Sequence, residues 1–280
     1  MKISVIIPAF NAHHSIHQGL ASLQRAWAEV ASSGVTFEAL VSIDDGRSAK
    51  YRASLDPFPF ARTIVGGTTG TGPSRARNRA LAVATGDYIA VLDADDSWSQ
   101  NYLTELLPLA FQHGASFGRT EILTEDGLTL DVFPRQKAQT HLALRDISYW
   151  SGSFHPIVRR DFMERNILDR AQDVWSAVTT IAKQGGQVPL APDARYQLRL
   201  RDGSMTTEDY YAAEVDESYA RLAKHAVEHP TLPSATRPTI KRLWEQKSVH
   251  NRQFIAAQTH RAAQGERLWS SFYHWRSSVV

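Results

Sequence analysis

The amino-terminal half of the chain alternates short, β-rich apolar runs with helical patterns. Four runs are predicted as strands, at residues 3–7, 37–43, 62–65 and 88–92, and the last is apolar at almost every position, as expected for a strand buried on both faces. After the first run, one stripe of apolar residues at helical spacing predicts a helix that packs on a sheet. The stripe consists of Ile16, Leu20, Leu23, Trp27 and Val30. This rhythm predicts an α/β fold built from parallel βαβ units with right-handed crossovers.

Later segments carry weaker patterns. A helix is expected at about 100–111, where Pro108 should kink it, and an Asp126-Gly127 turn predicts a hairpin over 122–133. A helix from about Asp173 and a strand at 196–200 follow, and the last third is helical, at 207–228 and 240–275. We therefore predict an α/β domain over residues 1–205 and a C-terminal helical region over 206–280.

Composition limits the chemistry. The chain has 280 residues, of which 42% are hydrophobic, enough to bury a full α/β core. It has no cysteine, so disulfides and thiolate sites are excluded, and any metal must use oxygen or imidazole ligands. No run of about 18 apolar residues and no signal-peptide pattern is present, which predicts a cytoplasmic protein. A net charge of +2 is too small to indicate nucleic-acid binding across the molecule.

The run Leu92-Asp93-Ala94-Asp95-Asp96 ends a predicted buried strand in three carboxylates. Ligands of open α/β sheets bind beyond the carboxyl ends of the strands. Two carboxylates one residue apart can converge on a divalent cation, which also holds phosphate oxygens. For an isolated Asp-x-Asp, capping of the next helix is the better interpretation, but the position after a buried strand favours a cation site.

A second acid pair, Asp44-Asp45, precedes Gly46 and also ends a strand. A plain Asp-Gly turn is the alternative. We expect the two acid-ended strands to be neighbours, so that negative charge gathers at one edge of the sheet. That arrangement costs free energy unless a cation or hydrogen-bond donors compensate the negative charge.

A glycine-rich loop, residues 66–72, opens into a helix with Pro73 in its first turn. Arginine forks and helix N-termini both suit phosphate oxygens. We predict a ligand-binding role for Arg77 and Asn78 in this helix. Arg75 and Arg79 are predicted to form an ordinary solvated face.

Together these motifs resemble glycosyltransferase family 2. The family's strand running into Pro-x-Tyr/Phe-Asn matches 5–11, and its Asp-Asp-Gly-Ser matches 44–48 with Arg47 as an extra or substituted position. Its Gly-x-x-x-Ala-Arg-Asn helix, its Ala-x-Gly-x-Tyr-Ile strand and its Leu-Asp-x-Asp-Asp run match 72–78, 84–89 and 92–96. The match covers residues 3 to about 111 in the right order, which is specific although each motif alone is weak.

The resemblance implies a GT-A fold, Rossmann-like, with a mainly parallel sheet flanked by helices, in a metal-dependent enzyme that passes a sugar from a nucleotide diphosphate to an acceptor hydroxyl with inversion. Residues 1–111 would form the nucleotide-binding half and 112–205 the acceptor half of the catalytic domain. UDP is the family's commonest nucleotide. The acceptor would be a saccharide or a lipid-linked saccharide, in polysaccharide or glycoconjugate synthesis.

The same resemblance implies roles for individual residues. Phe10 would stack on the nucleobase, and Asp45 would accept a hydrogen bond from the base. Asp93 would meet the ribose or a metal-bound water, and Asp95 would be the principal ligand of Mn²⁺ or Mg²⁺, with Asp93 as its neighbour in the metal site. The whole nucleotide-sugar site would then comprise Pro8, Ala9, Phe10, Asn11, Asp45, Arg77, Asn78, Asp93 and Asp95.

The family's catalytic base is usually the Asp of a Glu-Asp pair that begins a helix. Here Gln172 replaces the Glu and Asp173 remains, so Asp173 is the predicted base. Asp is also a common N-cap, and both roles stay open. His155 is set aside, because a lone His is more often structural. Arg199 and Arg201 would close over the diphosphate or form an exposed strand face.

The C-terminal segment is the basic part of the chain. Residues 237–280 contain eight Lys/Arg and only two acids. Aromatic and aliphatic residues recur at mostly helical spacings, with Gly265 as a breaker: Leu243, Trp244, Phe254, Ile255, Leu268, Trp269, Phe272 and Tyr273. Packing on the catalytic domain or on a second subunit of a homodimer is the favoured interpretation. Peripheral contact with the inner face of the membrane, near lipid-linked acceptors, is the alternative.

Two other functions compete. A sugar-phosphate nucleotidyltransferase would also use strand-end carboxylates and a metal, but the turn after the first strand lacks a glycine-rich phosphate loop, which equally disfavours a dinucleotide-binding oxidoreductase. A non-catalytic carbohydrate-binding relative is the third reading. Retention of Asp45, Asp93, Asp95 and Asp173 argues against it.

Overall fold

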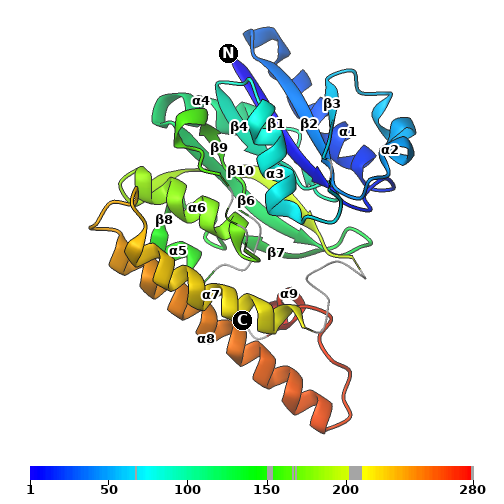
Figure 1. Cartoon of the computed structure of the whole chain (residues 1–280). Helices are drawn as coiled ribbons and strands as arrows, with labels where there is room; N and C mark the ends of the chain where they lie inside the picture. The colour runs from blue at the N-terminus through cyan, green and yellow to red at the C-terminus, as the bar shows by residue number, and fades with distance from the viewer. Residues whose placement is uncertain (67, 150–153, 166, 168, 202–209, 279–280) are drawn as a thin grey trace.

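The computed structural model describes residues 1–280 except 67, 150–153, 166, 168, 202–209 and 279–280. Its strands form one sheet (Figure 1). The strands are β1 (Lys2–Ala9), β2 (Thr36–Ile43), β3 (Ala61–Val65), β4 (Tyr88–Val91), β5 (Ser97–Trp98), β6 (Ala115–Leu123), β7 (Thr129–Phe133), β8 (His141–Ala143), β9 (Ile157–Arg159) and β10 (Gln187–Arg199).

The helices flank this sheet and continue beyond it to the C-terminus (Figure 1). They are α1 (Ile16–Ala28), α2 (Ser48–Leu55), α3 (Pro73–Val83), α4 (Tyr102–His113), α5 (Leu144–Ile147), α6 (Gln172–Lys183), α7 (Tyr211–Glu228), α8 (Arg237–Ala263) and α9 (Phe272–Ser278). Two short 3-10 turns lie at Ala31–Ser33 and Arg160–Phe162.

The sheet order is β3-β2-β1-β4-β9-β6-β10-β5, with β7 paired to β6 and β8 to β10. Strands β3, β2, β1 and β4 are parallel, as the βαβ rhythm predicts. Beyond β4 the sheet is mixed, because β9 runs antiparallel to both β4 and β6, while β6 and β10 are parallel. The predicted α/β fold with a C-terminal helical region is confirmed.

Successive side chains of a strand point to opposite faces of the sheet, and each face has its own core. On one face, Ile3, Val5 and Ile7 of β1 join a cluster with α1 and α4. On the other, Ile6 joins a cluster that includes residues of α3, α6 and α8. Helices therefore cover both faces, and the carboxyl ends of β1, β2 and β4 stay available for a site.

The C-terminal helices pack on the rest of the protein. Trp244 of α8 is fully buried and lies 6.3 Å, centroid to centroid, from Trp175 of α6, with nearly parallel rings. Leu243 and Phe254 are also buried, so the favoured packing interpretation holds for these side chains. Dimerisation and membrane contact stay predictions, and no helix in the described part of the chain is long and apolar enough to cross a bilayer.

Other expectations meet the structure with differences. The helix break predicted near Gly265 is confirmed, since α8 ends at Ala263 and Gly265 has a left-handed φ of 70°. Helix α2 was not predicted, because Tyr51 is its one buried residue and no apolar stripe marks it. Strand β10 begins nine residues earlier than expected, at Gln187 instead of Tyr196, in a stretch whose prolines weaken the strand signal. The predicted boundary at 205/206 and the start of the 207–228 helix lie outside the described residues.

Candidate active site

Three strands bring the predicted site residues to one edge of the sheet. Strand β1 contains Pro8 and Ala9 and runs into Phe10, β2 runs into Asp44, and β4 is followed by Leu92 and Asp93. The expectation that the two acid-ended strands are neighbours is wrong, because β1 pairs with both and lies between them. The two groups of acids are therefore separated by the turn after β1.

Asp45 organises that turn. Its carboxylate accepts hydrogen bonds from the backbone N–H of Asn11 at 3.0 Å, from the N–H of Arg47 at 2.9 Å and from the hydroxyl of Tyr51 at 3.0 Å. Burial alone would raise the pKa of Asp45, but these bonds hold it below its ordinary value. Asn11 adopts a left-handed φ of 51°, and the preceding Phe10 is 58% exposed at the edge of the sheet. An exposed ring beside a fixed carboxylate suits a flat, hydrogen-bonding ligand.

Asp44 is buried, and donors of the protein itself satisfy its carboxylate. It accepts bonds from Arg79 and from Thr71, both at 2.6 Å, and from the Gly72 N–H at 2.8 Å. These donors keep the pKa of Asp44 low although burial alone would raise it. The prediction that Arg79 is merely solvated is therefore wrong, because it pairs with Asp44, the residue that follows β2. The predicted exposure of Arg75 is confirmed.

Asp93 is held from two sides. A terminal nitrogen of Arg77 lies 2.6 Å from its Oδ1, and His155 Nε2 lies 3.3 Å from its Oδ2. Burial alone would raise the pKa of Asp93, but these two neighbours lower it well below the usual range. Arg77 is 4% exposed, so its guanidinium serves Asp93 and fixes it at the end of β4.

Tyr196 ties the acidic run to β10. Its hydroxyl accepts a hydrogen bond from the Asp93 N–H at 3.0 Å and donates one to Asp96 Oδ2 at 2.8 Å. The Arg199 N–H donates to the other oxygen of Asp96 at 3.0 Å. Burial and the neighbouring charges of Asp95 and Asp93 still raise the pKa of Asp96 well above its ordinary value. Asp96 is thus a buried anchor in the scaffold.

Asp95 differs from the other two acids of the run. No described side chain donates a hydrogen bond to its carboxylate, and Arg201 reaches only its backbone oxygen, at 3.4 Å. Burial and the charge of Asp93 raise the pKa of Asp95. One half-buried carboxylate of this kind fits a divalent cation, since Mg²⁺-type ions take one or two carboxylates and complete their shell with phosphate oxygens and waters.

Asp173 lies in the first turn of α6. The N-cap of this helix is Ala171, without a side-chain cap bond, so the alternative that Asp173 is the N-cap is wrong. The preceding Gln172 is buried and accepts a hydrogen bond from the Ser74 hydroxyl, which joins the first turns of α6 and α3. Asp173 borders a small cavity of about 10 Å³ together with Arg77 and His155, which places it behind the Asp93 cluster.

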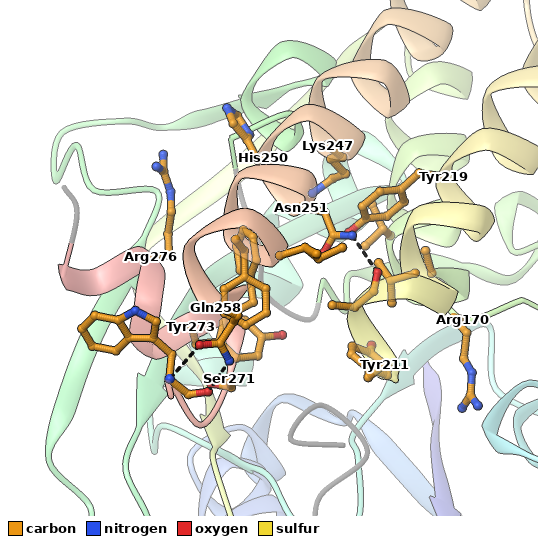
Figure 2. A pocket seen from close by; sticks show the side chains of 18 of the residues that line it. Arg170, Tyr211, Tyr219, Lys247, His250, Asn251, Gln258, Ser271, Tyr273 and Arg276 are labelled. Atoms are coloured by element: carbon orange, nitrogen blue, oxygen red, sulfur yellow. Dashed lines mark hydrogen bonds between the residues drawn. The ribbon is translucent and has the colours of Figure 1, made fainter. Parts of the chain in front are cut away.

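Asp173 also borders a much larger cavity, of about 400 Å³, to which α6, α7, α8 and α9 contribute residues. Aromatic and basic side chains line it together, and Figure 2 labels several of them, including Tyr211, Tyr219, Tyr273, Lys247, His250 and Arg276. Asp173 therefore lies between the acids after β4 and a cavity formed by the C-terminal helices.

Sequence reasoning missed three residues of this arrangement. His155 was set aside as structural, yet it touches Asp93. Tyr196 was predicted only as a strand residue, yet its hydroxyl joins Asp93 and Asp96. Lys247 was seen only as one of several basic residues, yet it is buried at the cavity. In the sequence these residues appear only as polar groups within or beside apolar patterns. Such a pattern does not show which residue each of them contacts.

Solved structures share this architecture. A fragment of S. aureus TarS superposes with a TM-score of 0.65 at 17% identity, over 93% of this chain and 74% of that chain. A mannosyltransferase of Pyrobaculum calidifontis, PcManGT, superposes with a TM-score of 0.58 at 18% identity, over 95% of this chain and 76% of that one. The fold is thus the GT-A fold of glycosyltransferases.

The model of the family described as "Glycosyl transferase family 2" matches residues 4–157, more than half of the chain. The chain therefore belongs to glycosyltransferase family 2 and is a glycosyltransferase. Its matched segment contains the turn after β1, Asp45, the Arg77 helix and the acidic run after β4. Asp173 and most of the residues that line the large cavity lie beyond it.

Curated relatives agree with this family. The succinoglycan biosynthesis protein ExoO of Rhizobium meliloti is 24% identical over 81% of this chain and 69% of its own length. The glucosyltransferase WfgD of Escherichia coli is 30% identical over 51% of this chain and 55% of its own. The amylovoran biosynthesis glycosyltransferase AmsB of Erwinia amylovora is 29% identical over 55% and 52%. The chain thus spans about two thirds of the first relative and about half of the other two.

Proposed function

We propose that this glycosyltransferase moves a sugar from a UDP-sugar to an acceptor hydroxyl in the synthesis of a polysaccharide or glycoconjugate, with a divalent cation, Mn²⁺ or Mg²⁺, and with inversion at the anomeric carbon. The observation that carries the proposal is the acidic run after β4. There, donors of the protein pair with Asp93 and Asp96, whereas the Asp95 carboxylate is left for a ligand.

The names of related proteins support the donor and the pathway. WfgD is named as an enzyme that uses UDP-Glc, and ExoO and AmsB are named for polysaccharide biosynthesis. Structures of TarS contain UDP-GlcNAc or UDP, and the PcManGT structure contains GDP-Man and Mn²⁺. UDP is favoured over GDP because both the WfgD name and the TarS complexes contain it.

In this proposal the turn after β1 binds the nucleoside. The exposed Phe10 stacks on the base, and Pro8, Ala9 and Asn11 shape the backbone beneath it. The Asp45 carboxylate already accepts three hydrogen bonds from the protein, and it orients the base through its remaining acceptor positions. Asn78 completes the site on α3.

Asp95 is the proposed ligand of the cation. When bound, the cation acts as a Lewis acid that neutralises the negative charge developing on the diphosphate as the sugar leaves. Asp93, held by Arg77 and His155, orients the ribose or a water of the cation's shell. Arg77 acts through Asp93, since its guanidinium is buried and already engaged.

Asp173 is the proposed base. The acceptor oxygen attacks the anomeric carbon opposite the diphosphate, the new C–O bond forms as the old one breaks, and the acceptor proton passes to the Asp173 carboxylate. The position of Asp173 between the acidic run and the large cavity supports this role, because the base must face both the donor and the acceptor.

The direct experiment is incubation with a panel of UDP- and GDP-sugars plus Mn²⁺, with release of the nucleoside diphosphate as the readout. We expect slow hydrolysis of one UDP-sugar that EDTA abolishes and Mn²⁺ or Mg²⁺ restores. Pyrophosphate release from a nucleoside triphosphate and a sugar phosphate would instead identify a nucleotidyltransferase. Binding of UDP without any turnover, with every acceptor tried, would identify a non-catalytic relative.

A further inference from the structure

Three tyrosines line the cavity of about 400 Å³ that Asp173 borders (Figure 2). Tyr211 and Tyr219 belong to α7, and Tyr273 belongs to α9. Each of the three residues is partly buried. The volume of the cavity lies in the range of ordinary small-molecule sites, roughly 300–1,000 Å³. Three phenol groups from two helices therefore share one space that is large enough for a ligand.

The hydroxyls of these three tyrosines have no hydrogen-bond partner among the residues that the structure describes. The fully buried tyrosines elsewhere in the protein differ. Tyr51 donates to a carboxylate at 3.0 Å, Tyr102 to a backbone carbonyl at 3.1 Å and Tyr196 to a carboxylate at 2.8 Å. Polar groups of a protein interior are normally hydrogen-bonded. The hydroxyls at the cavity therefore face water or a ligand that brings donors and acceptors of its own.

Asp173 is a shared neighbour of the three hydroxyls. Burial raises the pKa of each tyrosine, and the negative charge of Asp173 raises it further. The tyrosines also act on one another, since Tyr211 raises the pKa of both Tyr219 and Tyr273. Such effects fall off with distance. The three phenols therefore keep their protons and lie near the carboxylate that is the proposed base.

Tyr273 also lies near the acidic run after β4. The charge of Asp96 contributes to its raised pKa, after burial, the neighbouring tyrosines and Asp173. Its side chain packs against the core cluster that includes Leu198 of β10 and Leu200 just after it. Helix α9 thus places one hydroxyl of the cavity close to the proposed donor site.

Other aromatic rings form part of the wall. Phe254 of α8 and Phe272 of α9 lie 5.6 Å apart, centroid to centroid, and Trp269 lines the same cavity. The C–H faces of sugar rings pack well against aromatic rings, while tyrosine hydroxyls exchange hydrogen bonds with sugar hydroxyls. A saccharide ring therefore suits this cavity better than a purely apolar ligand does.

The basic groups of the lining do not identify the ligand. Burial lowers the pKa of Lys247 to about 7, and it also lowers the pKa of His250 and of Arg276. Arg170 forms a 2.6 Å ion pair with Glu214. Hydrogen bonding and ring packing, and not a net charge, are thus the features of this cavity that indicate what it binds.

We propose that Tyr211, Tyr219 and Tyr273 determine the acceptor specificity of this glycosyltransferase, and that the acceptor is a saccharide whose reacting ring enters this cavity. The nucleophilic hydroxyl of that ring lies at Asp173. The hydroxyls beside it exchange hydrogen bonds with the three tyrosines, and the face of the ring packs on the aromatic wall. The proposal rests on the proposed function, since it concerns the acceptor of that reaction.

The first test is transfer by the full chain, from the UDP-sugar that it hydrolyses and with Mn²⁺, to the methyl glycosides of glucose, galactose, mannose and N-acetylglucosamine. We expect at least one of them to be glycosylated. Analogues of the preferred glycoside that lack one hydroxyl beside the reacting one should then lose at least about tenfold in kcat/KM. The reason is that a site built to hydrogen-bond a substrate hydroxyl discriminates against the analogue without it.

The second test removes the hydroxyls of the protein. Tyr211→Phe, Tyr219→Phe and Tyr273→Phe keep the ring, and each should lower kcat/KM for the preferred glycoside by about tenfold. Where a tyrosine contacts a given sugar hydroxyl, its Phe variant should change kcat/KM for the matching deoxy analogue by less than about twofold, because the contact is already lost. UDP affinity should stay within about twofold throughout.

The matched control is Tyr88→Phe. Tyr88 lies on β4 outside the cavity, where its ring is 5.0 Å from that of Phe111, so the same loss of a hydroxyl should leave transfer unchanged. The melting temperature of each variant shows whether it is folded.

A last acceptor separates two sources of the same saccharide chemistry. The preferred sugar, joined through a diphosphate to a short isoprenoid, identifies a lipid-linked acceptor if it is used more efficiently than the methyl glycoside, and a free saccharide if it is not. Transfer to none of these acceptors by a chain that hydrolyses a UDP-sugar overturns the proposal. Unchanged kcat/KM in a folded variant with all three Tyr→Phe substitutions also overturns it. Failure to bind UDP is a different outcome, and it refutes the proposed function instead.

Discussion

The acidic run after β4 and the cavity of the C-terminal helices hold their charged groups in different ways. At the acidic run, buried carboxylates are paired with donors of the protein, as Asp93 is with Arg77 and Asp96 with Tyr196, and only Asp95 is left for a ligand. At the large cavity, Lys247, His250 and Arg276 border one space together with Asp173, and burial lowers the pKa of all three basic groups. Charges paired within the protein hold the scaffold, and the Asp95 carboxylate, to which no described side chain donates a hydrogen bond, stays available for a cation. Asp173 lies where the two regions meet.

The largest effect is expected on the acidic side. Asp95→Ala should lower sugar transfer on the order of 10³-fold, because a cation at the leaving group contributes several kcal/mol of transition-state stabilisation. Calorimetric titration with UDP should lose its Mn²⁺-dependent part in the same variant. Asp56→Ala, at an exposed acid, is the control. Undiminished Mn²⁺-dependent affinity in Asp95→Ala would sink the metal assignment.

The same substitution at two arginines contrasts the two regions directly. Arg77→Met removes one partner of a buried ion pair and should lower the free energy of unfolding by about 3 kcal/mol or more. Arg276→Met leaves no buried carboxylate behind and should cost less than about 1 kcal/mol. Urea denaturation measures both values. Equal losses in the free energy of unfolding would show that the two arginines contribute equally to stability, and would contradict this contrast.

A smaller effect concerns pH. Only the ionised Asp95 carboxylate binds a cation, so Mn²⁺-dependent UDP affinity is full above its pKa and lost as the pH falls through it. Because burial and Asp93 raise the pKa of Asp95, the loss should begin at a higher pH than for an ordinary aspartate, whose pKa is about 3.9. Asp93→Asn removes the negative neighbour and should move the midpoint to lower pH. A midpoint that does not move would show that Asp95 is not the titrating group.

Local sequence was sufficient for the first half of the fold and for the names of the acids. Strands β1, β2 and β4 are short apolar runs, and the acids follow them directly along the chain, so pattern and position identify both. The local sequence did not identify the side chains that pair with these acids. Arg79 bonds an acid 35 residues away, His155 one 62 residues away and Tyr196 one 100 residues away, and only tertiary packing brings them together.

The C-terminal region shows the same limit. Its aromatic stripe predicted burial correctly at Leu243, Trp244 and Phe254, because periodicity reports which face of a helix is apolar, but Leu268 of the same stripe is 45% exposed. Periodicity does not report where two helices leave a space between them. The cavity behind Asp173 depends on how α7, α8 and α9 are placed on α6, and this placement could not be read from 206–280 alone.

The central claim is that Asp173 takes the acceptor proton at the meeting point of the two sites. Asp173→Asn keeps the size of the side chain and removes its basicity, so the decisive measurement is the rate of sugar transfer by this variant beside its affinity for UDP and Mn²⁺. The account predicts a loss on the order of 10²-fold or more in transfer, with nucleotide affinity and melting temperature unchanged. Transfer at the normal rate by Asp173→Asn would contradict it.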